Sequence, residues 1–273
     1  MDFPLLDLAL ARRVEMAEAE AAVACARMVE ALQPETKAAI ASIAGGYAVY
    51  CGANSPVTQV VGVGLNGPVH EHEFDQLEDF YFSRKEPVRV ETCPMADVTL
   101  MQHYKQRGYW VSEYTNVMVR PVEAKEMWAP PDGVEIRKAS RKELDLWTLT
   151  VAQGFAEHYP VTKELLNVMK MFARGENAEC YLARIEGRVV GGATLAVREG
   201  IAGLFGASTL PEFRKRGVQT TLLLARLQRA AEAGCDLAVS LAQPGSVSQR
   251  NLARQGFRAL YTRVKFERAL PTS

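Results

Sequence analysis

Three consecutive cations, Arg214, Lys215 and Arg216, precede Gly217 in the stretch LPEFRKRGVQTTLL, between an expected strand and an expected helix. The start of a helix exposes backbone N–H groups without a partner inside the helix, and its dipole adds positive potential. Such a start binds anions, phosphate above all. Gly217 allows close approach of an oxygen because no Cβ stands in the way. The alternative is a basic helix start that faces water, in which the cations oppose the dipole.

Charge is distributed unevenly along the chain. Residues 1–130 hold 11 Lys and Arg against 18 Asp and Glu, whereas residues 131–273 hold 21 against 14. The C-terminal half is therefore the expected location of an anionic ligand. Its basic residues are not interleaved with aromatic residues, as a surface that stacks bases would require, so we expect no nucleic-acid partner.

The remaining composition indicates an intracellular protein. No apolar run approaches the ~18 residues that cross a bilayer, and the first residues do not resemble a secretory signal. The five cysteines are scattered and never spaced as CxxC, which favours reduced thiols. His70 and His72 have no third ligand in view, so no metal site is expected. We predict a cytoplasmic location and no membrane partner.

The elements that position the basic stretch alternate regularly in the C-terminal half. Ser140 and Glu143 form a capping box at the start of a helix, and Glu186-Gly187 is typical of a hairpin turn. In the helix after the cations, Leu223 and Leu227 are expected to be buried and Arg226 to be exposed. The pattern predicts an α/β (α+β) fold with a mixed, mostly antiparallel central sheet flanked by helices. The expected strands are 134–138, 178–185, 188–197, 200–210, 235–242 and 257–268, and the expected helices are 140–155, 161–175, 217–233 and 246–256.

The N-terminal half repeats part of this order. ARQGFRALYTRVKF (253–266) is similar to KQRGYWVSEYTNVMV (105–119) in its helix end, Gly-aromatic pair and Tyr-Thr-x-Val strand, which indicates an internal duplication. The predicted domains are 1–126 and 134–273, joined by a Pro- and Gly-containing linker, 127–133. The expected N-terminal helices are 7–32, 35–43, 70–84 and 97–107, and the expected strands are 46–52, 58–65, 87–92 and 110–119.

One N-terminal stretch, GVGLNG (62–67), matches the GxGxxG pattern of dinucleotide-binding folds. Pro68 stands where the last glycine should open the helix, so a nicotinamide site is not favoured. The acidic HEHEFDQLED that follows would repel a pyrophosphate. We interpret this half as a degenerate copy that binds no phosphate-bearing cofactor.

LPEFRKRGVQTTLL resembles the acetyl-CoA pyrophosphate motif of the GNAT superfamily of N-acetyltransferases, Arg/Gln-x-x-Gly-x-Gly/Ala. Arg214, Gly217 and Gln219 fill the three key places, and Gln219 departs from the usual Gly or Ala. PGSVSQRNLARQGF resembles the downstream helix of the superfamily that contacts CoA, with Ser248 and Arg250 in register. The resemblance covers about 134–268. It implies the GNAT acyl-CoA N-acyltransferase fold, here duplicated, with acetyl-CoA as cosubstrate.

The same resemblance implies the residues that hold the cofactor. Backbone groups on the third strand of the C-terminal half would bind the pantetheine arm, and N–H groups of the basic stretch would surround the pyrophosphate. The two positions on the downstream helix would lie near the other side of the cofactor. The implied contacts are Ala207, Ser208 and Thr209 for the arm, Arg214, Lys215, Arg216, Gly217, Val218, Gln219 and Thr220 for the pyrophosphate, and Ser248 and Asn251 on the helix.

The catalytic groups are less evident. The superfamily often carries a carboxylate base at the register of Gly203 and a tyrosine acid at that of Leu252, and both are missing here. Glu157, His158 and Tyr159, between the first two helices of the domain, are candidate catalytic residues, because His158 titrates near neutrality. A polar surface turn is the alternative for this segment. On the final strand, Tyr261 is a further tyrosine candidate, although its counterpart Tyr114 indicates packing.

The resemblance thus implies an N-acetyltransferase that transfers an acetyl group from acetyl-CoA to a primary amine by direct attack. The acceptor, a small molecule or a peptide, is not specified by the sequence, and a homodimer is left open. Two alternatives remain. The chain is a CoA-binding or regulatory protein with impaired catalysis, or a non-enzymatic interaction scaffold.

Overall fold

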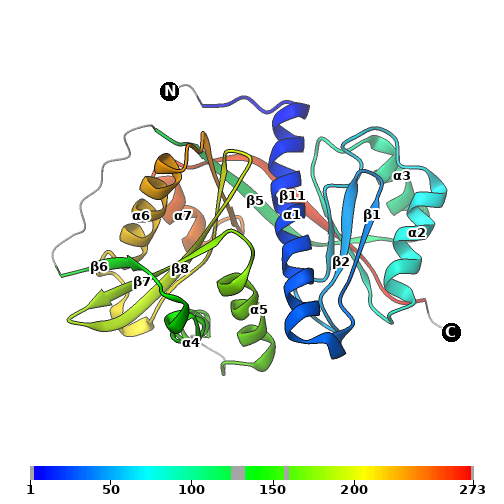
Figure 1. Cartoon of the computed structure of the whole chain (residues 1–273). Coiled ribbons are helices and arrows are strands. Elements are labelled where there is room, and N and C mark those ends of the chain that lie inside the picture. Colours follow the sequence, from blue (N-terminus) through cyan, green and yellow to red (C-terminus); the bar gives the residue numbers. More distant parts are fainter. Residues whose placement is uncertain (1–2, 124–132, 157–159, 272–273) are drawn as a thin grey trace. The chain divides into compact units, whose positions relative to one another are not determined.

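The computed structural model describes residues 3–123, 133–156 and 160–271 (Figure 1). The chain forms two compact units, and each takes segments from both halves of the sequence. Unit 1 contains Val119–Leu241 and Arg250–Arg258, and unit 2 contains Pro4–Met118, Ala242–Gln249 and most of the residues from Ala259 on. The predicted domains, 1–126 and 134–273, divide the chain at one point between the two sequence repeats. This division stays a prediction.

Unit 1 is built on strands in the order β10-β9-β8-β7-β6. The pairs β6–β7, β7–β8 and β8–β9 are antiparallel, and β9–β10 is parallel. The hairpin turn falls at Glu186 and Gly187 as predicted, with φ of 51° and 77°. The strands are β6 (Glu135–Lys138), β7 (Ala178–Ile185), β8 (Arg188–Arg198), β9 (Ile201–Thr209) and β10 (Leu237–Ala242), and the helices are α4 (Leu144–Phe155), α5 (Lys163–Arg174) and α6 (Val218–Glu232).

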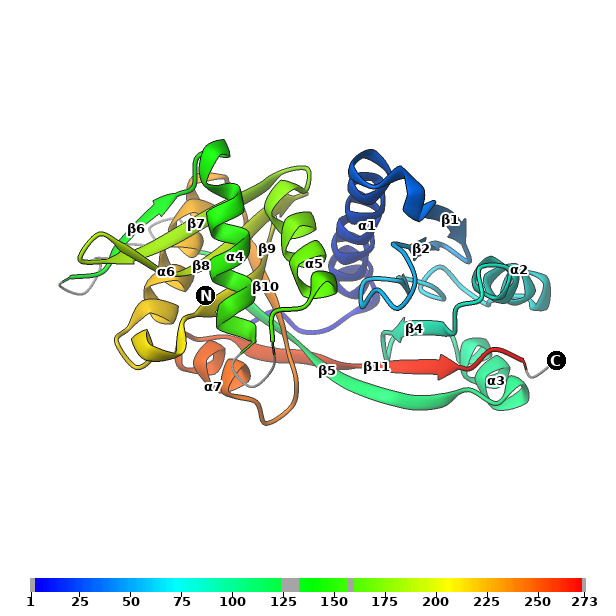
Figure 2. The ribbon, with the colours of Figure 1, turned by 90° about the horizontal axis from the view of Figure 1, so that it is seen from below.

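Helices lie on both faces of these strands (Figure 2). Neighbouring glycines on β8 show this arrangement, because successive residues of a strand point to opposite faces. A Cβ at Gly191 would meet Val218 of α6, whereas a Cβ at Gly192 would meet Trp147 and Val151 of α4. The chain continues after β10 into α7 (Val247–Arg254) and β11 (Arg258–Arg268).

Unit 2 has the strand order β1-β2-β3-β4-β11-β5. The pairs β1–β2, β2–β3 and β4–β11 are antiparallel and the β3–β4 pair is parallel. The core of the unit packs Val60 and Val90 of the sheet against Phe74 and Leu77 of α2. The elements are α1 (Leu8–Leu32), β1 (Ala39–Ile43), β2 (Gly46–Tyr50), β3 (Gln59–Val61), α2 (Glu71–Phe82), β4 (Val88–Thr92), α3 (Val98–Arg107) and β5 (Trp110–Pro121).

The helix predicted at 35–43 is wrong. The chain forms one short 3-10 turn at Pro34–Thr36 and then strand β1, which pairs with β2 from Ala39↔Tyr50 to Ile43↔Gly46. Pairing with a neighbouring strand overrides the helical preference of the alanines. The correction strengthens the repeat, because three strands, a helix, a strand, a helix and a strand now follow one another in both halves. The mixed, mostly antiparallel α/β fold is confirmed.

Within the described parts of the chain, no helix is both long and apolar enough to cross a membrane. All five cysteines are free thiols.

Candidate functional site

Strands β9 and β10 pair only at their beginnings. Their parallel register runs from Leu237↔Ile201 to Val239↔Gly203 and ends there. One residue further on, the Ser240 hydroxyl of β10 donates a hydrogen bond to the Leu204 carbonyl, at 2.9 Å. Within the described residues, β8 is therefore the strand that pairs with the remainder of β9, and the other edge of β9 can offer backbone groups to a ligand.

A bulge interrupts β9 beyond this point. Thr194 of β8 pairs with Phe205 and Gly192 pairs with Ser208, so that Gly206 and Ala207 together oppose one residue. An extra residue of this kind bends a strand and turns its next backbone groups in a new direction. The predicted pantetheine contacts, Ala207 to Thr209, thus begin in the bulge and continue beyond it.

Arg226 of α6 holds the bulge from inside the protein, and the prediction that it is exposed is wrong. Its side chain is 3% exposed. Nη1 donates to the Thr194 carbonyl at 2.9 Å and to that of Phe205 at 3.5 Å, and Nε donates to Leu222. Burial lowers the pKa of Arg226. Helical periodicity predicts an exposed Arg226 because it considers only residues of the same helix. The carbonyls that accept its hydrogen bonds come from strands that are distant in the sequence.

The start of α6 has the features of an anion site. Lys215 and Gly217 both adopt left-handed conformations, with φ of 62° and 81°. Among the described residues no side chain caps this helix, so the N–H groups of its first turn, Val218 to Thr220, are available to a ligand. The side chains of Lys215 and Arg216 are exposed beside them. Backbone donors and two cations at one helix start fit the oxygens of a pyrophosphate.

Arg214 plays a different part from its two neighbours. Its side chain is half-buried, and its guanidinium donates to the carbonyl of Thr209 at 3.3 Å and to that of Gly154 at 3.0 Å. It therefore ties the basic turn to the end of β9 and to α4. The acidic residue nearest in sequence, Glu212, pairs with Arg188 at 2.9 Å.

The end of β9 packs tightly against α4. Ser208 and Thr209 are each 4% exposed, and the Ser208 hydroxyl donates to the Val151 carbonyl at 2.9 Å. A Cβ at Gly154 of α4 would lie only 2.3 Å from Ser208 Oγ. This glycine allows the two backbones to come together, and pattern reasoning did not single it out.

The two helix contacts implied by the resemblance lie one turn apart on α7. Ser248 is exposed, and Asn251 is half-buried and accepts a hydrogen bond from Arg254 at 3.1 Å. The residue that caps α7 is Ser246, whose hydroxyl accepts the Gln249 N–H at 3.1 Å. The Ser-x-x-Gln spacing is a capping signal that could have been recognised in the sequence.

The candidate catalytic residues Glu157, His158 and Tyr159 lie outside the described residues. At the positions where the superfamily often carries its base and its acid, Gly203 is half-buried on β9 and Leu252 is buried on α7. Tyr261 belongs to unit 2, where its hydroxyl donates to Glu15 Oε1 at 2.6 Å, and burial raises its pKa. This tyrosine is therefore part of a buried network.

The corresponding helix start in unit 2 is closed by its own residues. The His70 N–H at the start of α2 donates to Glu73 Oε2 at 2.9 Å, and Glu71 adds a second carboxylate to the first turn. The rings of His70 and His72 stack with centroids 5.8 Å apart. Within the described ranges, no group of three or more His, Cys, Asp or Glu side chains could hold a metal ion.

Three features of this α/β domain suit a phosphate-bearing cofactor. Strands β9 and β10 separate, β9 carries a bulge, and the basic start of α6 has no side-chain cap. Residues 143–257 match the model of the Acetyltransferase (GNAT) family. The C-terminal half of the chain therefore contains a domain of the GNAT acetyltransferase family, at residues 143–257.

Solved structures with the same fold extend this likeness beyond the C-terminal half. A GCN5-related N-acetyltransferase from Kribbella flavida has a TM-score of 0.64 at 16% identity, with 91% of this chain and 96% of that chain covered. A tandem GNAT protein from the clavulanic acid biosynthesis pathway has a TM-score of 0.57 at 14% identity, with 84% and 74% covered. At these identities the likeness shows the fold alone. No curated protein matches the chain.

Proposed function

We propose that the protein is an N-acetyltransferase that transfers an acetyl group from acetyl-CoA to a primary amine by direct attack. The observation that carries this proposal is the uncapped start of α6, with Lys215, Arg216 and Gly217, immediately after the strand end that β10 leaves unpaired. Phosphates of the cofactor would meet the helix start, and its pantetheine arm would lie along residues 207–209.

Acetyl-CoA supplies an acyl group that is activated as a thioester. In the transfer, a carbon–nitrogen bond forms to the amine and the carbon–sulfur bond breaks. The amine gives one proton to a base, and the thiolate that leaves gains one. His158 is our proposed base because its ordinary pKa lies near neutrality, with Glu157 and Tyr159 as alternatives. The chain itself contributes orientation, through backbone donors that need no rearrangement.

The cofactor proposal is tested by Gly217→Asp, which places a carboxylate where the pyrophosphate would lie. Gly234→Asp is the matched control, because Gly234 lies just beyond the other end of α6 with a similar φ of 74° and open space around its Cβ. We expect millimolar acetyl-CoA to raise the Tm of the wild type and of Gly234→Asp, but not that of Gly217→Asp. An unchanged wild-type Tm, or equal shifts in both variants, would contradict the proposal.

A second candidate function is CoA binding without catalysis. It is favoured by Gly203 and Leu252 at the positions of the usual base and acid, and by the engagement of Tyr261 with Glu15. Thiol release from acetyl-CoA with a panel of amines separates the two candidates. Binding without thiol release would support the second.

We also infer that the N-terminal half holds no CoA, since the start of α2 is already occupied by Glu73. Titration calorimetry should accordingly give one acetyl-CoA per chain.

A further inference from the structure

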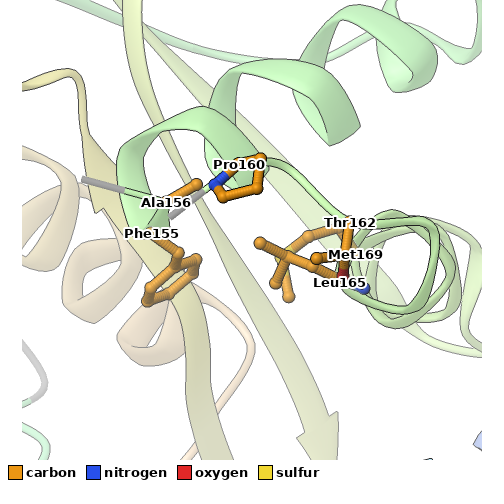
Figure 3. Close-up of a pocket in the computed structure, with 6 residues that line it drawn as sticks. All are labelled: Phe155, Ala156, Pro160, Thr162, Leu165 and Met169. Carbon is orange, nitrogen blue, oxygen red and sulfur yellow. Dashed lines mark hydrogen bonds between the residues drawn. The ribbon is translucent and has the colours of Figure 1, made fainter. Parts of the chain in front are cut away.

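A pocket lies between the end of α4 and the start of α5 in unit 1 (Figure 3). Its volume is about 380 Å³. The rim is open to solvent, with Phe155 48% exposed, and Met169 forms a buried part of the wall at 3% exposure. The lining residues are Phe155, Ala156, Pro160, Thr162, Leu165 and Met169.

The lining has almost no polar chemistry to offer. The one hydroxyl in the described part of the lining, that of Thr162, already accepts the Leu165 N–H at 3.2 Å as the cap of α5. Among the lining residues that the structure describes, none is charged. A hydrated hydroxyl or ammonium group placed here would lose water without gaining a partner. The pocket therefore favours a hydrocarbon surface.

The position of the pocket links it to the proposed acyl-transfer site. Phe155 directly follows Gly154, which packs against Ser208 at the end of β9. On the other wall, Met169 lies one helical turn before Phe172, and a Cβ at Gly206 of the bulge would come within 3.2 Å of the Phe172 ring. Both walls are thus anchored to residues 206–208, where the pantetheine arm is proposed to lie.

We propose that this pocket holds the apolar part of the acceptor, so that the preferred acceptors are primary amines carrying an aromatic or branched aliphatic group. This inference rests on the proposed acetyl transfer. An apolar cavity of about 150 Å³ accommodates benzene, so the larger volume here has room for a ring and a short linker to the amine. The open rim allows the acceptor to enter from solvent.

Phenethylamine and ethylamine form a matched pair of probes, because they differ only by the ring. With acetyl-CoA and the wild type, we expect kcat/KM from thiol release to be at least about tenfold higher for phenethylamine. Putrescine, a dication without an apolar end, should be no better than ethylamine. Comparable values for the three amines would overturn the inference and leave the proposed acetyl transfer intact.

Phe155→Ala tests the pocket itself. Leu149→Ala is the control, since Leu149 lies on the same helix, is 45% exposed and does not line the pocket. We expect Phe155→Ala to lower the ratio of kcat/KM for phenethylamine to that for ethylamine about tenfold, whereas Leu149→Ala keeps the wild-type ratio. If Phe155→Ala instead lowers turnover with octanoyl-CoA and spares phenethylamine, the pocket holds the acyl chain and the inference is wrong.

A binding measurement separates this inference from catalysis. With the methionine methyl groups labelled with carbon-13, phenethylamine should shift the Met169 resonance in the presence of acetyl-CoA, and ethylamine should not. Met169→Leu assigns the resonance, and the shift should be lost in Phe155→Ala. An unmoved Met169 resonance overturns the inference. Failure of acetyl-CoA to raise the wild-type Tm would instead overturn the proposed function.

Discussion

Gly154 determines how closely α4 approaches β9. Within a helix, alanine is ordinarily preferred over glycine by about 1 kcal/mol. At this position, however, a Cβ would lie 2.3 Å from Ser208 Oγ and 2.7 Å from Ser208 Cβ. Steric overlap with a buried strand outweighs helix propensity, because neither backbone can move away without disturbing the Arg214 and Ser208 hydrogen bonds.

We therefore expect Gly154→Ala to lower the free energy of unfolding by about 1–3 kcal/mol. Adding Ser208→Gly removes the two atoms nearest to the new methyl, so the double variant should lose less than the sum of the single losses. Urea unfolding of the four proteins in the cycle measures this coupling. A more stable Gly154→Ala, or strictly additive losses, would contradict the close packing.

Individual residues of the site could be predicted only in part. The cations and Gly217 were recognisable because a helix start and its charges lie within one short stretch of sequence. Arg214 and Arg226 were not distinguishable from ligand-binding or exposed cations. Their acceptors, the carbonyls of Gly154 and Thr194, are brought to them by tertiary structure. A local pattern does not contain such partners.

The capping box before α4 illustrates what a local pattern does contain. As predicted, the Glu143 carboxylate accepts from the Ser140 N–H at 3.0 Å and from the Ser140 hydroxyl at 2.7 Å. Arg184 donates to the same carboxylate at 2.9 Å. These hydrogen bonds to Ser140, with Arg184 and Arg137 adding to them, lower the pKa of Glu143 to about 2.

This shift predicts a pH-dependent contribution to the stability of the α4 region. Because the folded-state pKa lies below the unfolded one, the carboxylate stabilises the fold above the unfolded pKa, about 4.3. That contribution is lost as the pH falls towards 2. Glu143→Gln should therefore be less stable than the wild type at pH 7, and thermal unfolding should show the difference narrowing between pH 5 and about 2. A difference that is constant with pH would exclude this origin.

Secondary-structure elements that a single short stretch of sequence specifies are predicted correctly. Elements that depend on pairing with another strand are not. The Glu186-Gly187 hairpin and the helix after Gly217 lie where expected. The sequence predicts a helix where β1 forms, since AIASI carries no alternation strong enough to reveal its pairing with β2. The bulge at Gly206 was also missed, because strand register depends on two segments at once.

At the scale of the whole molecule, the compact units do not follow the order of the chain. Val264 to Arg268 of β11 pair with Thr92 to Val88 of β4, so the last strand of the sequence completes unit 2. In the same unit, Arg263 is 1% exposed and its Nε donates to the fully buried Glu15 of α1 at 3.1 Å. A repeat in sequence predicts two similar halves, but it cannot tell which half receives a given strand.

This arrangement predicts that the N-terminal repeat does not fold by itself. A fragment of residues 1–126 lacks β11, which exposes the edge of β4 and leaves Glu15 buried without Arg263 or Tyr261. Removing one partner of a buried ion pair costs about 3–5 kcal/mol, a large part of the 5–15 kcal/mol that stabilises a typical domain. We expect the fragment to show no cooperative thermal transition by circular dichroism.

Co-expression with residues 127–273 should restore that transition, because the second fragment supplies β11. Residues 127–257, which end before β11, should fail to restore it and serve as the control. Cooperative unfolding of 1–126 alone would mean that the strand and the ion pair are dispensable. Equal rescue by both C-terminal fragments would mean that contacts other than β11 complete the unit. Only the first of these outcomes would make the two repeats separable domains, as their sequences alone suggest.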